Sequence, residues 1–195
     1  MGINNKMIIA GPCSIEKKEE FFKTVNSIYK YVDCIRCGVW KARTSPRNYP
    51  GIGAPALKWI QDAQKNYNVP FAIEVGTKTH VELALDHNIK IFWLGARTTC
   101  NPFAVQEIAD AIKGLDTEIW IKNPIFTDLD LWLGAVERLK LNNIKVIHRG
   151  FYEEKTTKYR NTPRWDLVKK FKNYYPDIPI ICDPSHISGK RSLIY

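Results

Sequence analysis

Residues 116–150 read DTEIWIKNPIFTDLDLWLGAVERLKLNNIKVIHRG, and this stretch decides the fold class. It opens with a short apolar run at Glu118–Ile121 and closes with a second one at Lys145–Ile147. Short, continuously apolar runs are typical of strands buried on both faces of a sheet. Between them, apolar residues recur at the spacing of a helix, at Leu129, Trp132, Leu133, Val136 and Leu139. The stretch therefore predicts a strand–helix–strand unit with parallel strands.

The same alternation runs through the rest of the chain. Further strands are expected at Met7–Ala10, Cys34–Val39, Phe71–Val75, Ile91–Leu94 and Ile178–Cys182. Helix starts are expected at a capping box of Thr79 with Glu82, and where a cap residue precedes proline at Asn101-Pro102 and Thr162-Pro163. No Gly-x-Gly-x-x-Gly fingerprint follows the first strand, which argues against a dinucleotide-binding fold.

Seven strand–helix units in series favour an α/β fold of the (β/α)8 TIM barrel type over a doubly wound sheet. Such a barrel usually needs about 250 residues, whereas this chain has 195 and stops soon after the seventh strand. We therefore expect one barrel domain over residues 1–195, truncated at its C-terminus, with the eighth strand and the last helices missing.

Composition narrows the classes of function. The chain is 45% hydrophobic and 25% charged, which is ordinary for a globular protein and excludes a disordered chain. No apolar run approaches the roughly 20 residues of a membrane helix. The apolar run near the amino end is too short for a signal peptide. The formal charge of +9 is scattered along the chain, so we expect no nucleic-acid partner. A cytoplasmic protein with no membrane partner is the expectation.

The five cysteines are an odd number in a chain too large to need disulfides, so reduced thiols are expected. Cys34 and Cys37 have the spacing of a redox or zinc motif, but they lie in a predicted strand. An offset of three sends two strand side chains to opposite faces. We interpret the pair as structural.

Barrel enzymes carry their chemistry at the carboxyl ends of the strands. Cations gather there in this sequence, at Arg36, Lys41, Arg43, Arg97, Lys122 and Arg149. Each alone could be a surface charge at a turn, but a cation next to a buried strand is costly unless an anion meets it. Guanidinium groups bind phosphate or carboxylate through two hydrogen bonds, and lysine supplies a point charge. The set predicts a site for small phosphorylated molecules.

Cys13 and His186 follow the first and seventh strands and are the candidate metal ligands. A thiolate with an imidazole suits a divalent ion such as Mn, Fe, Co or Zn. The alternatives are a buried free thiol and a loop histidine. His148 is expected to orient its neighbour Arg149.

Six motifs in order carry a resemblance: Ile9-Ala10-Gly11-Pro12-Cys13-Ser14, Lys41-Ala42-Arg43-Thr44-Ser45-Pro46, Gly95-Ala96-Arg97-Thr98-Thr99, Lys122-Asn123-Pro124, His148-Arg149-Gly150 and Asp183-Pro184-Ser185-His186. With them the chain resembles, over its whole length, the class I 3-deoxy-7-phosphoheptulonate (DAHP) synthases and the related 3-deoxy-octulosonate 8-phosphate synthases. Other runs look like the DAHP synthase subgroup that is often fused to chorismate mutase, and we expect no chorismate mutase domain within residues 1–195.

The resemblance implies the first step of the shikimate pathway, in which phosphoenolpyruvate and erythrose 4-phosphate condense in an aldol-type, carbon–carbon bond-forming reaction that releases phosphate. Phosphoenolpyruvate would be bound by Arg36, Lys41, Gly95, Ala96, Arg97, Lys122 and Arg149. The sugar phosphate would meet Arg43, Thr44 and Ser45. The resemblance gives catalytic roles to Lys41, Lys122, Arg97 and Arg149, and places a divalent metal on Cys13 and His186.

Two departures keep alternatives open. DAHP synthases have proline where this chain has Ala42. The octulosonate enzymes, which use arabinose 5-phosphate, have alanine there, but they have asparagine where this chain has Arg43, so Arg43 favours DAHP synthase. The family completes its metal site with a Glu and an Asp that would lie beyond Tyr195. A non-catalytic fragment that binds phosphoenolpyruvate is therefore a second alternative. We expect the 195-residue chain itself to be weakly active or inactive, and the full-length protein to be a homo-oligomer.

Overall fold

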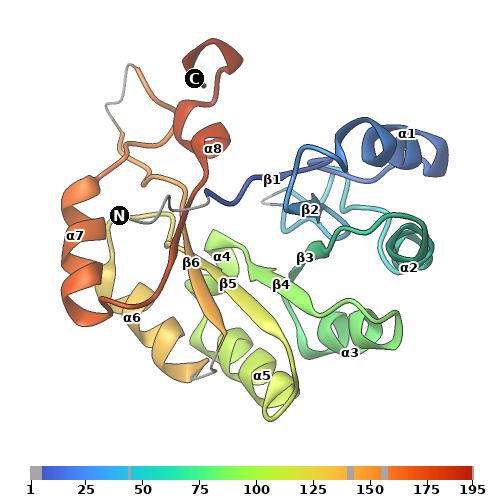
Figure 1. The fold of residues 1–195 in the computed structure, drawn as a ribbon. Coiled ribbons are helices and arrows are strands. Elements are labelled where there is room, and N and C mark those ends of the chain that lie inside the picture. The colour runs from blue at the N-terminus through green and yellow to red at the C-terminus, as the bar shows by residue number, and fades with distance from the viewer. Residues whose placement is uncertain (1–5, 44, 140–142, 155–157, 195) are drawn as a thin grey trace, which may run out of the picture. The chain divides into compact units, whose positions relative to one another are not determined.

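The computed structural model describes residues 6–43, 45–139, 143–154 and 158–194 (Figure 1). They form two compact units, each described here by itself. Unit 1 comprises Met1–Val75 with Thr79–Phe92, and unit 2 comprises Gly76–Lys78 with Trp93–Tyr195.

Strands and helices alternate along the described residues. The strands are β1 (Ile9–Ala10), β2 (Cys34–Cys37), β3 (Phe71–Val75), β4 (Ile91–Leu94), β5 (Glu118–Lys122), β6 (Ile144–His148) and β7 (Ile180–Cys182). The helices are α1 (Lys18–Ile28), α2 (Pro55–Asn66), α3 (Lys78–Asp86), α4 (Ala96–Thr99), α5 (Pro102–Ile112), α6 (Leu129–Arg138), α7 (Trp165–Tyr174) and α8 (Pro184–Ser188), followed by a 3-10 turn at Arg191–Leu193.

In unit 1, strands β1, β2 and β3 pair in parallel. Ile9 pairs with Cys34, and Ile35 pairs with Phe71. Helices α1 and α2 bury their apolar faces, with Phe21 and Leu57 almost completely inaccessible to solvent. The parallel pairing brings the carboxyl ends of β1 and β2 together, where Cys13 and Lys41 follow in the chain.

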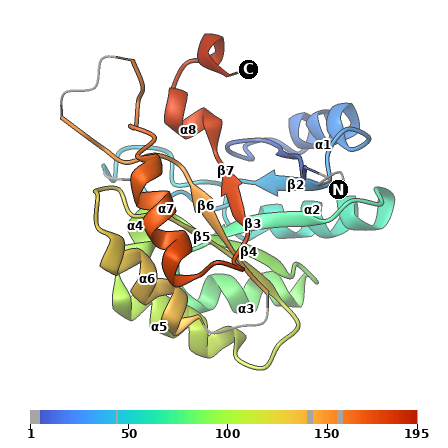
Figure 2. The ribbon, with the colours of Figure 1, turned by 60° about the vertical axis from the view of Figure 1, so that its left-hand side comes forward.

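In unit 2, strands β5, β6 and β7 also pair in parallel, with Lys122 beside Ile147 and His148 beside Cys182 (Figure 2). Aromatic rings fill the space between the strands and their helices. Trp132 of α6 packs 4.5 Å from the ring of Phe171 in α7. This contact joins α6 to α7.

Helix starts agree with the sequence in part. Asn101 caps α5 as expected, since its side chain accepts hydrogen bonds from the backbone nitrogens of Phe103 and Ala104. The capping box at Thr79 is wrong, because α3 begins at Lys78 and Thr79 already lies inside its first turn. The start at Thr162-Pro163 is also wrong: Thr162 forms an antiparallel bridge with Phe151, and the helix begins later, at Trp165.

The predicted fold class is confirmed. In the part of the chain that the structure describes, seven strands follow one another in chain order, each strand pairing detailed above is parallel, and helices separate the strands, as in the strand–helix order of a (β/α)8-type α/β fold. Within the described ranges, no helix is both long and apolar enough to span a membrane.

Candidate functional site

Unit 1 gathers a thiol and two cations at the ends of β1 and β2. We call Cys13, Arg36 and Lys41 the loop cluster. Lys41 Nζ donates a hydrogen bond to the Cys13 carbonyl oxygen and lies 3.5 Å from Cys13 Sγ. Partial burial raises the pKa of the Cys13 thiol, but the charges of Lys41 and Arg36 outweigh it, and the net pKa is lowered. The two cations therefore make the Cys13 thiol easier to deprotonate than an isolated thiol.

Glycine makes this close approach possible. A Cβ at Gly38 would overlap the Cys13 carbonyl oxygen and lie 2.6 Å from Lys41 Nζ. A Cβ at Gly11, whose φ is +152°, would overlap the carbonyl oxygen of Arg36. The two glycines let the chain after β1 lie against β2 and its following loop.

The rest of the predicted sugar-phosphate segment lies on the loop after β2. Arg43 is exposed and donates from Nε to the Tyr49 carbonyl oxygen at 3.0 Å. Ser45 is half-buried, with its hydroxyl 3.4 Å from the backbone nitrogen of Arg47. Thr44 lies outside the described residues.

Unit 2 gathers a second group of charges at the ends of β5, β6 and β7. We call Lys122, Arg149, Asp183 and His186 the strand-end cluster. Asp183 is its centre: Oδ2 lies 2.7 Å from His186 Nδ1 and 3.6 Å from Lys122 Nζ, and Oδ1 accepts a hydrogen bond from the His186 backbone nitrogen. Each member is at least partly buried. The sequence motif contained Asp183 but did not reveal its central place.

The charges of the strand-end cluster act on one another. Burial raises the pKa of Asp183, but His186 and Lys122 outweigh it and hold the pKa well below its usual range. Burial lowers the pKa of Arg149, against the attraction of Asp183. The hydrogen bond to Asp183 raises the pKa of His186, while burial and Lys122 lower it, and the net pKa is lowered.

Asn123 is a structural member of this site that the sequence did not single out. Its side chain is fully buried; Oδ1 accepts a hydrogen bond from the Arg149 backbone nitrogen at 2.8 Å, and Nδ2 donates to the Gly150 carbonyl oxygen at 2.9 Å. The amide therefore fixes the end of β6 against the end of β5. The feature of the sequence that could have identified Asn123 is its position directly after Lys122, at the end of β5.

The segment after β4 supplies the remaining predicted residues. Gly95 is buried at the cap of α4 and Ala96 begins that helix. Arg97 is exposed, and its charge contributes to lowering the pKa of Arg149. Thr99 donates from its hydroxyl to the Lys122 carbonyl oxygen at 2.9 Å, which ties α4 to the end of β5.

His148 does not orient Arg149 through a side-chain hydrogen bond, contrary to expectation. Its imidazole is completely buried, 4.5 Å from the ring of Trp165, and within the described residues neither ring nitrogen has a hydrogen-bond partner. Burial and the neighbouring charge of Arg149 lower its pKa to about 4. Asn123, rather than His148, holds the Arg149 backbone.

The predicted metal ligands Cys13 and His186 lie in different units, and each has suitable chemistry. The charges of Lys41 and Arg36 lower the pKa of the Cys13 thiol. The contact of His186 Nδ1 with Asp183 leaves Nε2 as the donor atom, an arrangement common around metal-bound histidines. Among the described residues, no three His, Cys, Asp or Glu side chains gather to hold a metal ion. Cys34 and Cys37 are fully buried, and burial raises the pKa of Cys37, which agrees with a structural role.

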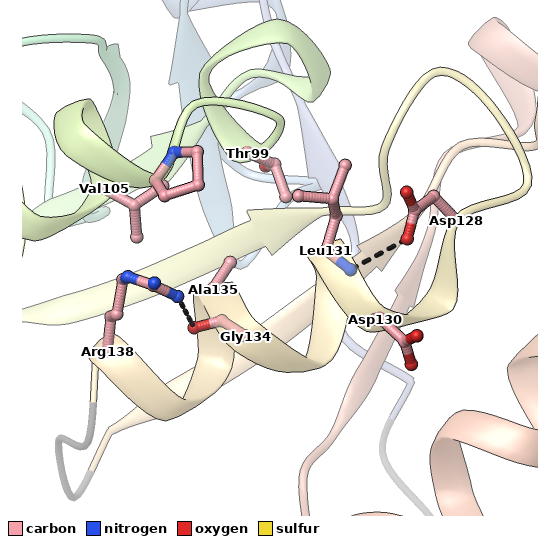
Figure 3. A pocket seen from close by; sticks show the side chains of 9 residues that line it. Thr99, Val105, Asp128, Asp130, Leu131, Gly134, Ala135 and Arg138 are labelled. Carbon is pink, nitrogen blue, oxygen red and sulfur yellow. Dashed lines mark hydrogen bonds between the residues drawn. The ribbon is translucent and has the colours of Figure 1, made fainter.

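A pocket of about 370 Å³ lies elsewhere in unit 2, on the helices rather than at the strand ends (Figure 3). Its polar lining already serves the fold: Asp128 accepts from the Leu131 backbone nitrogen and caps α6, and Arg138 donates to the Gly134 carbonyl oxygen (Figure 3). The charged residues of the two clusters do not line it, so we do not assign it to the chemistry of the site.

Comparisons with known proteins agree with the motifs. A Thermotoga maritima protein named phospho-2-dehydro-3-deoxyheptonate aldolase is 26% identical over 193 residues. That alignment covers 96% of this chain and 54% of the relative, so the chain spans about half the length of the curated relative it matches.

Two solved structures from the same organism share the fold. The crystal structure of phospho-2-dehydro-3-deoxyheptonate aldolase (DAHP synthase) gives a TM-score of 0.81 at 23% identity, covering 97% of this chain and 54% of that one. A truncated form of 3-deoxy-D-arabino-heptulosonate 7-phosphate synthase gives 0.76 at 24% identity, covering 97% and 68%. Finally, the model of the DAHP synthetase I family matches residues 1–194. The chain belongs to the DAHP synthetase I family.

Proposed function

We propose that this protein condenses phosphoenolpyruvate with erythrose 4-phosphate to give 3-deoxy-7-phosphoheptulonate and phosphate, the first step of the shikimate pathway. The observation that carries the proposal is the strand-end cluster. Lys122 and Arg149, from neighbouring strands, lie partly or fully buried around Asp183 and beside His186. Buried cations at the ends of parallel strands are suited to a small, highly charged anion.

Charge supports the assignment of substrates. Two phosphate esters and one carboxylate bring roughly five negative charges, counting each phosphate at nearly −2. Phosphoenolpyruvate would meet Arg36, Lys41, Gly95, Ala96, Arg97, Lys122 and Arg149. Erythrose 4-phosphate would meet Arg43, Thr44 and Ser45 on the loop after β2, where the exposed guanidinium of Arg43 can reach a phosphate.

The chemistry needs charge stabilisation and proton transfer. In the proposed reaction the enol carbon of phosphoenolpyruvate attacks the aldehyde of the sugar, water adds to the second carbon, and phosphate leaves. Ammonium groups of Lys41 and Lys122 would stabilise developing negative charge and donate protons, and Arg97 and Arg149 would hold the departing phosphate. These residues supply the catalytic roles of the proposal.

Cys13 Sγ and His186 Nε2 would hold a divalent metal ion, for which Mn, Fe, Co and Zn all suit a thiolate–imidazole pair. A bound metal would supply Lewis acidity toward the aldehyde oxygen. Asp183 would fix the His186 tautomer, and Lys41 would favour the Cys13 thiolate. The proposal also places the protein in the cytoplasm, with residues 1–195 forming one barrel domain that is incomplete at its C-terminus and with the full-length protein assembling as a homo-oligomer.

The test is phosphate release, measured with this chain and with any longer product of the same reading frame. Phosphate should appear only when phosphoenolpyruvate, erythrose 4-phosphate and a divalent metal are present together. Replacing erythrose 4-phosphate with arabinose 5-phosphate should slow the release. Equal or faster release with arabinose 5-phosphate would overturn the substrate, and binding of phosphoenolpyruvate without turnover in every product would overturn the catalytic proposal.

A further inference from the structure

Two aromatic side chains outside both clusters stack face to face in unit 1. The ring of Trp40 lies 4.0 Å from that of His80, and the two planes differ by only 6°. Trp40 directly precedes Lys41 of the loop cluster, and His80 lies in the first turn of α3. Both side chains are half-buried. The stack therefore joins α3 to the segment that carries the predicted phosphate-binding residues.

The loop after β2 is closed at its base by the backbone. The Lys41 backbone nitrogen donates to the Pro50 carbonyl oxygen at 2.8 Å, and that of Gly53 donates to the Val39 carbonyl oxygen at 3.2 Å. Gly51 has a φ of +93°, and a Cβ there would overlap the Val39 carbonyl oxygen. These contacts fix the ends of the loop but leave the direction of the Trp40 and Lys41 side chains to their own partners.

Those partners lie on different parts of unit 1. Lys41 reaches the Cys13 carbonyl oxygen and lies 3.5 Å from Cys13 Sγ, whereas Trp40 packs on His80. Because the two residues are adjacent in the chain, a rotation of the backbone that released Trp40 from His80 would also turn Lys41 away from Cys13. Stacking of the His80 ring on Trp40 thus opposes that rotation. The stack depends on contact between the two rings and needs no polar contact.

We propose that His80 is a positioning residue for the loop after β2: by stacking on Trp40 it holds Lys41 toward Cys13 and orders the following segment that carries Arg43 and Ser45. The role in substrate binding rests on the proposed function, whereas the ordering of the loop does not. An aromatic ring at position 80 is what the stack requires, so phenylalanine should replace histidine there.

Trypsin reports loop order without any substrate. It cleaves after Lys41, Arg43 and Arg47, which all lie in this loop. His80→Ala should raise the rate of cleavage at these bonds about tenfold, and His80→Phe should leave it near that of the unaltered protein. His87→Ala is the matched control, because His87 lies just after the same helix and its Nδ1 is 2.8 Å from the Leu83 carbonyl oxygen, away from Trp40. If His80→Ala does not fold, His80→Gln removes the ring with a smaller loss of volume.

Kinetics then separate positioning from simple stability. His80→Ala should raise the KM for erythrose 4-phosphate several-fold while His87→Ala, at equal or lower Tm, leaves it unchanged. Equal cleavage of the loop in His80→Ala and the unaltered protein would overturn the proposal, as would equal cleavage in His80→Ala and His87→Ala. Ring-dependent protection of the loop, together with no turnover by this chain or by any longer product of the reading frame, would contradict the proposed function and leave the role of His80 standing.

Discussion

The two charged clusters differ in how the chain holds them. The strand-end cluster lies at the carboxyl ends of β5, β6 and β7, has the Asp183 carboxylate at its centre and Arg149 only 8% exposed, and borders the fully buried Asn123. The loop cluster contains no carboxylate, Cys13 is exposed, and its lysine belongs to a loop. Buried groups held by several partners are positioned more rigidly than exposed groups on loops.

The difference suggests a division of work between the strand-end cluster and the loop after β2 that carries Arg43 and Ser45. A buried network with little freedom suits a small substrate that must be held in one orientation. A loop held by a few contacts suits a longer, more flexible sugar phosphate. Four predictions test this comparison, from the largest expected effect to the smallest.

Arg149→Gln should lower kcat/KM for phosphoenolpyruvate about 1,000-fold, which corresponds to about 4 kcal/mol of transition-state stabilisation. The reason is that the uncharged amide replaces a buried guanidinium at the end of β6. Steady-state phosphate release measures the effect. A loss smaller than that caused by Arg43→Gln would reverse the proposed ranking of the strand-end cluster above the loop after β2.

Asn123→Ala should lower the free energy of unfolding by about 3 kcal/mol, because it leaves the buried Arg149 backbone nitrogen without the Asn123 oxygen and removes one of the hydrogen bonds to the Gly150 carbonyl oxygen. Asn101→Ala, which removes the cap of α5, is the control and should cost about 1 kcal/mol. Urea unfolding compares them. Equal losses in the two variants would show that the buried amide is not what makes the strand-end cluster rigid.

Because of His148, the free energy of unfolding should decrease as the pH falls. Its pKa in the folded protein is about 4, below the ordinary value of 6.5, so the unfolded chain binds a proton that the folded chain does not. The resulting stabilisation is complete above pH 6.5 and is lost as the pH falls from 6.5 to 4, by up to about 3 kcal/mol. Unfolding at a series of pH values should show a steeper decline for the unaltered protein than for His148→Phe. Parallel declines would rule out this source of acid sensitivity.

Arg43→Gln should raise the KM for erythrose 4-phosphate about tenfold and leave the KM for phosphoenolpyruvate within twofold. The side chain is exposed, and losing one solvent-accessible phosphate contact costs less than losing a buried one. Initial rates with each substrate varied in turn give both values. An equal rise in both KM values would show that the loop does not discriminate between the substrates.

Strands were predictable where apolar residues run without interruption. The bounds of β3 and β4 match the expected ranges, whereas β1 and β7 are shorter than expected. The predicted helix starts at Thr79 and Thr162 were wrong because a cap residue must have non-helical backbone geometry directly before the first turn, and the residue type alone does not determine that geometry. Thr162 was already paired with Phe151.

The cations of the site could be found from sequence because a charge next to a buried strand is conspicuous. The arrangement of the hydrogen-bonding groups around these cations could not be found from the sequence. Asp183 lies in the centre of the strand-end cluster only because three neighbouring strands end together, and Asn123 acts through backbone atoms of a strand that follows much later in the chain. Spacing along the chain does not contain these hydrogen bonds.

The most direct test of the central claim is calorimetric titration of phosphoenolpyruvate, without sugar phosphate, into the unaltered protein, Lys122→Gln and Arg43→Gln. If the strand-end cluster binds this substrate, Lys122→Gln should weaken the affinity at least 30-fold and Arg43→Gln should change it less than threefold. Unchanged affinity in Lys122→Gln, with the fold intact, would contradict the account.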